Sequence, residues 1–296
     1  MSKRGKSINL YLMDGVPGGR IKCTLANWTG VAYKIPRTAL DLCKERDDLK
    51  QSGVYFLFGT SDLTGNNIVY IGQAGARKNG EGLLCRLFEH KRNSDKDYWT
   101  EAVVFTTSNN SFGPTEISYL ENRFCGLALA AKRYEVKNGN DPTQGNITEE
   151  KECELEEFID YARIVMGTLG NRVFEALVAV SPIIGAEERP IVEEPFLYFE
   201  NANAKATGRR TSEGFVVLQG SILSHKIAKS CPEIAIKMRA KYRDRIDEDN
   251  TLTEDILLSS PSAAAAFVGG SSLNGNELWK TEEGIMLKNI EKMIEN

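Results

Sequence analysis

The stretch that most constrains the fold is residues 53–72, which have the pattern of a β-hairpin. Two runs of strand length, 54–58 and 68–71, consist mainly of β-branched and aromatic residues, and a segment rich in Gly, Ser, Asp and Asn separates them. Side chains alternate between the two faces of a strand. The sequence therefore predicts a hairpin in which one tyrosine of each strand, Tyr55 and Tyr70, faces a common site.

An amphipathic helix is predicted after the hairpin, over residues 83–91. Its buried side is a stripe of Leu and Phe side chains. Arg86 and His90 are four residues apart and therefore lie on one face of this helix, beside the apolar stripe. We expect both side chains to point toward the edge of the sheet.

A third strand is predicted over 99–107, followed by a long helix that begins near Pro114. Glu121 falls within the apolar stripe of that helix. A carboxylate that faces a core is costly unless it is paired or binds a metal. Glu121 is therefore the preferred metal ligand, and Glu116, a turn and a half earlier, is the alternative.

An ordered set of motifs in this region resembles the GIY-YIG nuclease family. The set comprises Gly53-Val54-Tyr55, Tyr70-Ile71-Gly72, then Arg86, Glu121 and an Asn-rich stretch that ends at a proline. The resemblance implies a small α/β domain that cuts phosphodiesters with one divalent metal ion. Mg²⁺ or Mn²⁺ would be the cofactor, and Glu121 its ligand.

The resemblance also implies roles for the remaining residues. Arg86 would bind the scissile phosphate, and Tyr55, Tyr70 and His90 would position or deprotonate the attacking water. Which of these three is the base stays open, because a free tyrosine near pKa 10 is a weak base at neutral pH whereas histidine is not. Asn138 would orient neighbouring groups, with Asn140 as the second candidate for that role.

Composition and pattern divide the chain into four predicted segments. Residues 1–50 form an N-terminal β element of three short antiparallel strands, followed by a helix over 36–50. Residues 51–147 form the nuclease-like domain, 148–200 an acidic connecting helix and linker, and 201–296 a C-terminal domain.

The charge is unevenly distributed along the chain. Residues 148–200 hold 13 acidic and 4 basic side chains, and we expect the helix over 147–168 to expose most of its glutamates, with a linker at 185–195. Residues 205–245 hold ten basic and three acidic side chains. The low isoelectric point of about 5.5 therefore does not exclude a nucleic-acid partner.

The C-terminal segment has an ordered pattern of its own: a strand over 214–220, a basic helix over 232–247 and an Ala-rich helix capped by Ser260. It resembles an uncharacterised C-terminal domain of one branch of the GIY-YIG proteins and, less closely, a module associated with restriction adenine methylases. Lys237 and Lys241 on the basic helix are candidates for nucleic-acid binding. The alternative is a solvated helix that pairs with the acidic segment.

The sequence as a whole predicts an α/β (α+β) protein, in which a small antiparallel sheet is flanked by helices and a separate α+β domain follows. No apolar run approaches the ~18 residues of a membrane helix, and the six scattered cysteines with two histidines argue against zinc. We expect a cytoplasmic, magnesium-dependent endonuclease acting on DNA. The alternatives are a DNA-binding protein that does not cleave and a subunit of a larger assembly.

Overall fold

A computed structural model describes residues 5–75, 82–139, 146–178 and 194–294 of the chain. The chain divides into two compact units, an N-terminal unit up to Ala176 and a C-terminal unit from Leu177. Each unit combines a β-sheet with helices, which confirms the predicted α+β architecture. No helix among the described residues is long and apolar enough to cross a membrane.

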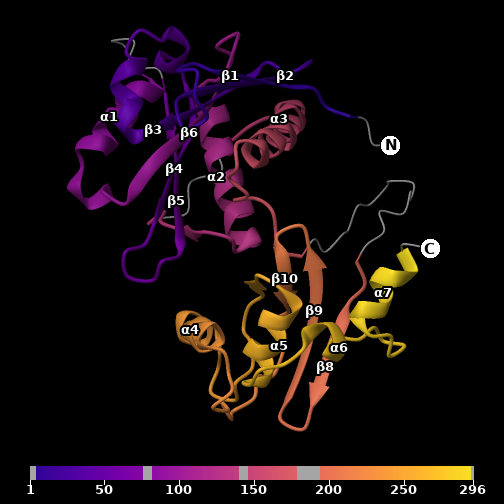
Figure 1. The fold of residues 1–296 in the computed structure, drawn as a ribbon. Coiled ribbons are helices and arrows are strands. Elements are labelled where there is room, and N and C mark those ends of the chain that lie inside the picture. Colours follow the sequence, from indigo (N-terminus) through magenta and orange to yellow (C-terminus); the bar gives the residue numbers. More distant parts are fainter. Residues whose placement is uncertain (1–4, 76–81, 140–145, 179–193, 295–296) are drawn as a thin grey trace. The chain divides into compact units, whose positions relative to one another are not determined.

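The N-terminal unit is built on a seven-stranded sheet (Figure 1) with the strand order β1-β2-β3-β6-β4-β5-β7. The short pair β5–β7 is parallel, and the other pairs are antiparallel. The strands are β1 (Ile8–Leu12), β2 (Ile21–Leu25), β3 (Gly30–Pro36), β4 (Gly53–Thr60), β5 (Asn67–Ala74), β6 (Trp99–Thr107) and β7 (Glu135–Val136).

The predicted hairpin is confirmed as β4 and β5, whose register pairs Tyr55 with Gly72 and Leu57 with Tyr70. The alternation of the strand is also confirmed. Val54 and Phe56 belong to a core on one face of the sheet, whereas Tyr55 and Leu57 belong to a core on the other. Tyr55 and Tyr70 therefore lie on the same face.

Helices cover both faces of this sheet (Figure 1). α2 (Pro114–Ala131) and α3 (Glu149–Thr168) pack on the face that carries Phe56, and α1 (Leu83–Arg92) packs on the face that carries Tyr55. The tyrosine face is completed by two 3₁₀-helices, η1 (Arg37–Cys43) and η2 (Asp47–Lys50).

The single helix predicted over 36–50 is wrong in kind. The segment forms η1 and η2 instead, because Arg46 between them has an extended backbone with a ψ of 104°. Leu40 and Cys43 are buried and three residues apart. That spacing suits the three residues per turn of a 3₁₀-helix, in which residues i and i+3 lie one above the other.

The first 50 residues are not a separate element. β3 hydrogen-bonds directly to β6, so β1 to β3 extend the same sheet. The nearly continuous burial of β3 explains this position, because a strand in the middle of a covered sheet is apolar on both faces. α3 also belongs to this unit: Phe158 and Ile159 pack in its core. The described parts of 1–50 and 51–147 thus form one unit with α3.

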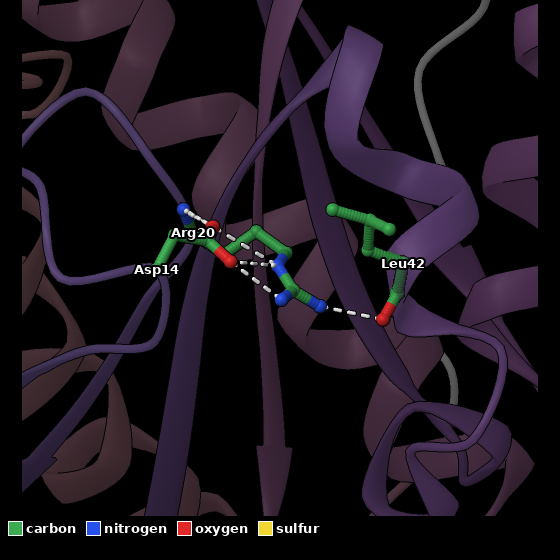
Figure 2. A network of polar contacts seen from close by, with 3 residues as sticks. All are labelled: Asp14, Arg20 and Leu42. Carbon is green, nitrogen blue, oxygen red and sulfur yellow. Dashed lines mark hydrogen bonds and ion pairs between the residues drawn. The ribbon is translucent and has the colours of Figure 1, made fainter.

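Hydrogen bonds of Arg20 connect the turn between β1 and β2 to η1 (Figure 2). Arg20 donates to Asp14 from its backbone N–H and from its guanidinium, and a further N–H of the guanidinium donates to the carbonyl of Leu42. The hydrogen bonds from Arg20 lower the pKa of Asp14 to about 2. The turn between β1 and β2 is therefore held against the helix that lies on the tyrosine face.

The C-terminal unit has a four-stranded antiparallel sheet with the order β11-β10-β9-β8. The elements are β8 (Leu197–Asn201), β9 (Ala204–Thr211), β10 (Gly214–Val217), α4 (Glu233–Lys241), η4 (Arg243–Arg245), β11 (Ile256–Leu258), α5 (Pro261–Gly269), α6 (Gly275–Leu278) and α7 (Leu287–Ile294). The basic helix and the Ala-rich helix were predicted, but the basic helix ends at Lys241 and the strand from Gly214 ends at Val217; α6 and α7 were not predicted.

Because β8 already begins at Leu197, the C-terminal sheet starts before the boundary predicted at 201. Most of the predicted linker lies outside the described residues. Trp279 lies at the centre of this unit's core, fully buried with its ring 4.6 Å from that of Phe215 and 5.5 Å from that of Phe199. Its indole N–H donates to the carbonyl of Pro261 at 3.0 Å, so the one polar atom of the ring is satisfied.

Candidate active site

The tyrosines of the hairpin form the base of the candidate site. The ring centroids of Tyr55 and Tyr70 are 6.2 Å apart. Tyr55 is buried and Tyr70 half-buried, so Tyr70 is the tyrosine that solvent reaches. Gly72 makes this arrangement possible, since a Cβ at that position would lie 2.3 Å from the Tyr55 hydroxyl oxygen and 2.4 Å from its Cζ. The ring of Tyr55 therefore occupies the space that any other residue at position 72 would fill.

The helix α1 brings His90 onto the two tyrosines. Its Nε2 is 2.7 Å from the hydroxyl of Tyr55, and its ring centroid is 5.3 Å from that of Tyr55 and 5.4 Å from that of Tyr70. His90 is only 3% exposed. Burial, aided by the charges of Lys96 and Arg86, lowers its pKa to about 4, so the imidazole is neutral at physiological pH.

Tyr55 is also uncharged, because burial raises the pKa of its hydroxyl, and the neighbouring Tyr70 acts in the same direction. The charge of Arg86 opposes this shift. Tyr55 and His90 thus form a buried, neutral, hydrogen-bonded pair, in which a proton can pass between the hydroxyl oxygen and Nε2.

Arg86 lies one turn before His90 on α1, as the sequence predicted. Its guanidinium is half-buried and donates to Glu89 at 2.6 Å. This contact raises the pKa of Arg86 further, so its charge is permanent. The charge of Arg86 acts to lower the pKa values of Tyr55, His90 and Glu121.

Glu121 reaches the site from α2. It is half-buried, and its Oε2 accepts a hydrogen bond of 2.9 Å from the side-chain amide of Gln73 on β5. Burial raises the pKa of its carboxyl group, while the hydrogen bond from Gln73 and the charge of Arg86 oppose the shift. The alternative, Glu116, is engaged elsewhere: its carboxylate accepts from the backbone N–H of Gly113 at the start of α2.

Asn138 binds the edge strand of the hairpin. Its side-chain oxygen accepts from the N–H of Ile71 at 3.1 Å, and its amide donates to the carbonyl of the same residue at 2.7 Å. The side chain thus satisfies the backbone of β5 between Tyr70 and Gly72, where β7 no longer pairs. The second candidate, Asn140, lies outside the described residues.

Two residues of this cluster were not predicted from the sequence. Lys96 ends the 3₁₀-helix η3 (Ser94–Lys96), and its Nζ lies 3.2 Å from the centroid of the Tyr70 ring. Gln73 follows directly on the tripeptide Tyr70-Ile71-Gly72 and orients Glu121. A lysine in a polar turn and a glutamine in a strand are too common for the sequence alone to single them out.

Glu121 is the residue of this cluster that could hold a metal ion. In the described part of the chain, no group of three or more His, Cys, Asp or Glu side chains is arranged to hold a metal ion. Glu121 is instead a single, oriented carboxylate. That suits Mg²⁺, which keeps most of its waters and is commonly held by one or two carboxylates together with substrate phosphates.

The basic helix of the C-terminal unit is only partly available to a ligand. Lys237 is exposed but pairs with Glu233 at 2.7 Å, and Lys241 is exposed at the end of α4. Arg239 points inward and donates to three backbone carbonyls. Nucleic-acid binding through Lys237 and Lys241 stays a prediction.

Comparison with known proteins gives one match. The sequence profile of a domain of unknown function, DUF4357, matches residues 197–291, which span the C-terminal unit from β8 into α7. No curated protein and no solved structure matches the chain. The matched family carries no assigned activity, and it does not include the residues of the candidate site.

Proposed function

We propose that the N-terminal unit is a magnesium-dependent endonuclease that hydrolyses phosphodiester bonds of nucleic acid, namely DNA. The observation that carries the proposal is the packing of Tyr55, Tyr70 and His90 on one face of the hairpin, where the charge of Arg86 from α1 acts on them. That charge also acts on Glu121, which α2 holds against Gln73 at the end of β5. These are the positions that the resemblance to the GIY-YIG nucleases assigns: Tyr55, Tyr70, Arg86, His90 and Glu121. Asn138 contacts the same edge of β5.

In this proposal Arg86 binds the scissile phosphate. A guanidinium has five N–H donors in a planar fork, so Arg86 can retain its contact with Glu89 and still present donors to a phosphate. Glu89 holds the side chain in place before the substrate arrives, which reduces the entropy lost on binding.

The proton of the attacking water is taken up by Tyr55 and His90. As the water oxygen bonds to phosphorus, its proton passes to the hydroxyl oxygen of Tyr55, and the proton of that hydroxyl passes to Nε2 of His90, 2.7 Å away. Tyr70, which solvent reaches, positions the water. His90 is neutral at physiological pH, so its ring nitrogen is free to accept this proton. Its lowered pKa makes it a weaker base than a free imidazole, and the negative charge of the bound phosphate has to stabilise the imidazolium.

Glu121 supplies the metal ligand, oriented by the hydrogen bond from Gln73. Bound there, Mg²⁺ would neutralise the negative charge that develops on the leaving 3′ oxygen. The carboxyl group must be ionised to bind the ion, so ion binding has to offset the burial that raises its pKa.

We expect the purified chain to nick plasmid or branched DNA with Mg²⁺ and to be inactive with EDTA. Glu121→Gln removes the anionic ligand at nearly constant volume, and Arg86→Ala removes the phosphate contact. Each should lower the cleavage rate by roughly 10² to 10³, the effect of losing one electrostatic stabiliser in an active site. The measurement is the initial rate of plasmid nicking, with circular dichroism to confirm folding.

Glu116→Gln is the matched control, since it makes the same chemical change on the same helix. Glutamine at this position can still accept from the N–H of Gly113, so both the fold and the cleavage should be retained. Cleavage by Glu121→Gln at the wild-type rate would refute the assignment. Wild-type protein that binds DNA without cutting it would favour the alternative, a DNA-binding protein that does not cleave.

A further inference from the structure

Among the described residues, Lys96 is a cation without a carboxylate partner at the edge of the tyrosine cluster. Its Nζ lies over the ring of Tyr70 at 3.2 Å from the centroid, and within the described residues no Asp or Glu pairs with it. Most basic side chains on the surrounding elements do have such a partner: Arg86 contacts Glu89, and Lys91 contacts Asp41.

The surroundings of Lys96 disfavour its charge in the free protein. Burial and the charge of Arg86 lower its pKa to about 8, and Lys96 in turn contributes to the low pKa of His90. Two cations from different elements, α1 and η3, are thus held near one pair of tyrosine rings. Repulsion between the two cations raises the energy of the empty site. A bound anion removes this repulsion and therefore stabilises the site.

We propose that Lys96 binds the phosphate adjacent to the scissile one, so that Arg86 and Lys96 together hold two successive phosphates of a DNA strand. This inference rests on the proposed nuclease function and specifies its substrate: a strand with consecutive phosphates, not an isolated phosphodiester. Tyr70 supports the ammonium through its ring face, a contact that leaves the N–H donors on the side away from the ring free for the phosphate.

The test compares ligands that carry one or two phosphates, without metal and at low salt. The probes are the thymidine dinucleotide, with a single phosphodiester, and the same dinucleotide with an added 5′ or 3′ phosphate. Wild-type protein should bind one of the phosphorylated probes more tightly. Lys96→Ala should weaken the binding of that probe about tenfold, as expected for one charge-assisted hydrogen bond, and leave the unphosphorylated probe unchanged. Lys96→Arg should restore most of the difference.

Lys91→Ala is the control for net charge. Lys91 lies on α1 near Lys96 in the chain, and removing it leaves Asp41 paired with Lys44, so the preference for the second phosphate should persist. The dissociation constants can be measured by titration calorimetry or by NMR shift changes. Arg86→Ala should weaken the binding of all three probes.

The outcomes separate this inference from the nuclease proposal. If Lys96→Ala binds all probes as the wild type does while the wild type cuts DNA, the second phosphate site is wrong and the nuclease stands. If the second phosphate depends on Lys96 but the wild type never cuts DNA with Mg²⁺, the phosphate site stands and the nuclease is wrong. Failure of the wild type to bind any probe contradicts the inference outright.

Discussion

The buried His90 makes the N-terminal unit sensitive to acid. Burial lowers its folded-state pKa to about 4, compared with about 6.5 in an unfolded chain, so the unfolded state binds more protons between these pH values. The stability contributed by neutral His90 is therefore complete above about pH 6.5 and is lost as the pH falls toward 4. The linkage amounts to roughly 3 kcal/mol.

We expect the free energy of unfolding of the wild type to fall more steeply between pH 6.5 and 4.5 than that of His90→Gln, which cannot take up this proton. Urea unfolding at a series of pH values measures the difference. His225→Gln is the control, because His225 is the only other histidine and lies in the C-terminal unit. Parallel pH profiles for the wild type and His90→Gln would show that the histidine is not buried in its neutral form.

At the level of single residues, the sequence predicted the position and the face of those candidate-site residues that lie in strongly periodic elements. Tyr55 and Tyr70 follow from strand alternation, and Arg86 and His90 from helical spacing. The burial of His90 was not predicted, because it depends on how α1 is placed against β4. Lys96 was not predicted for a similar reason: its contact with Tyr70 depends on tertiary packing and leaves no pattern in the local sequence.

Among the elements, α4 carries a basic side chain, Arg239, that stabilises the fold through hydrogen bonds to backbone carbonyls. The guanidinium of Arg239 donates to the carbonyls of Phe267 at 2.7 Å and Val268 at 2.9 Å, and to that of Ser224 at 2.7 Å. Phe267 and Val268 lie in the last turn of α5, where the carbonyls have no partner within the helix. Arg239 thus caps one helix from another and places a positive charge at its negative end.

We expect Arg239→Lys to destabilise the C-terminal unit by about 2 kcal/mol, because an ammonium cannot reach all three carbonyls in this fork geometry. The carbonyl of Val268 keeps the N–H of Ser224 as a donor, so the loss falls on the carbonyls of Phe267 and Ser224. Lys241→Ala, at an exposed position on the same helix, should change stability by less than about 0.5 kcal/mol. Thermal unfolding followed by circular dichroism measures both. Equal effects of the two substitutions would contradict the capping role.

The sequence predicted the hairpin, the strand over 99–107, and α1 and α2 close to their observed bounds, since turn residues and proline mark their ends. The prediction from sequence was wrong or incomplete where contacts between distant segments determine the structure. The segment from 36 to 50 has the composition of a helix, yet it forms two 3₁₀-helices under the sheet. The sequence could not predict that β3 pairs with β6, because an apolar run such as that of β3 is common to many strands.

On the scale of the whole molecule, each unit has its own hydrophobic core, and the division lies near Ala176. Because neither core takes a described residue from the other unit, we expect residues 1–178 and 194–296, produced separately, to fold cooperatively. The first should retain the DNA cleavage that we propose for the full chain. Calorimetry of each fragment tests the folding, and a fragment without a cooperative transition would show that the units depend on one another.

The burial of Trp279 gives the C-terminal unit an optical signal of its own. The chain has three tryptophans, and the other two, Trp28 and Trp99, lie in the N-terminal unit. With its ring enclosed between Phe199 and Phe215, Trp279 emits from an apolar site, and its emission moves to longer wavelength when water reaches the ring. In a variant that carries Trp28→Phe and Trp99→Phe, the wavelength of maximum tryptophan emission therefore reports the unfolding of the C-terminal unit alone.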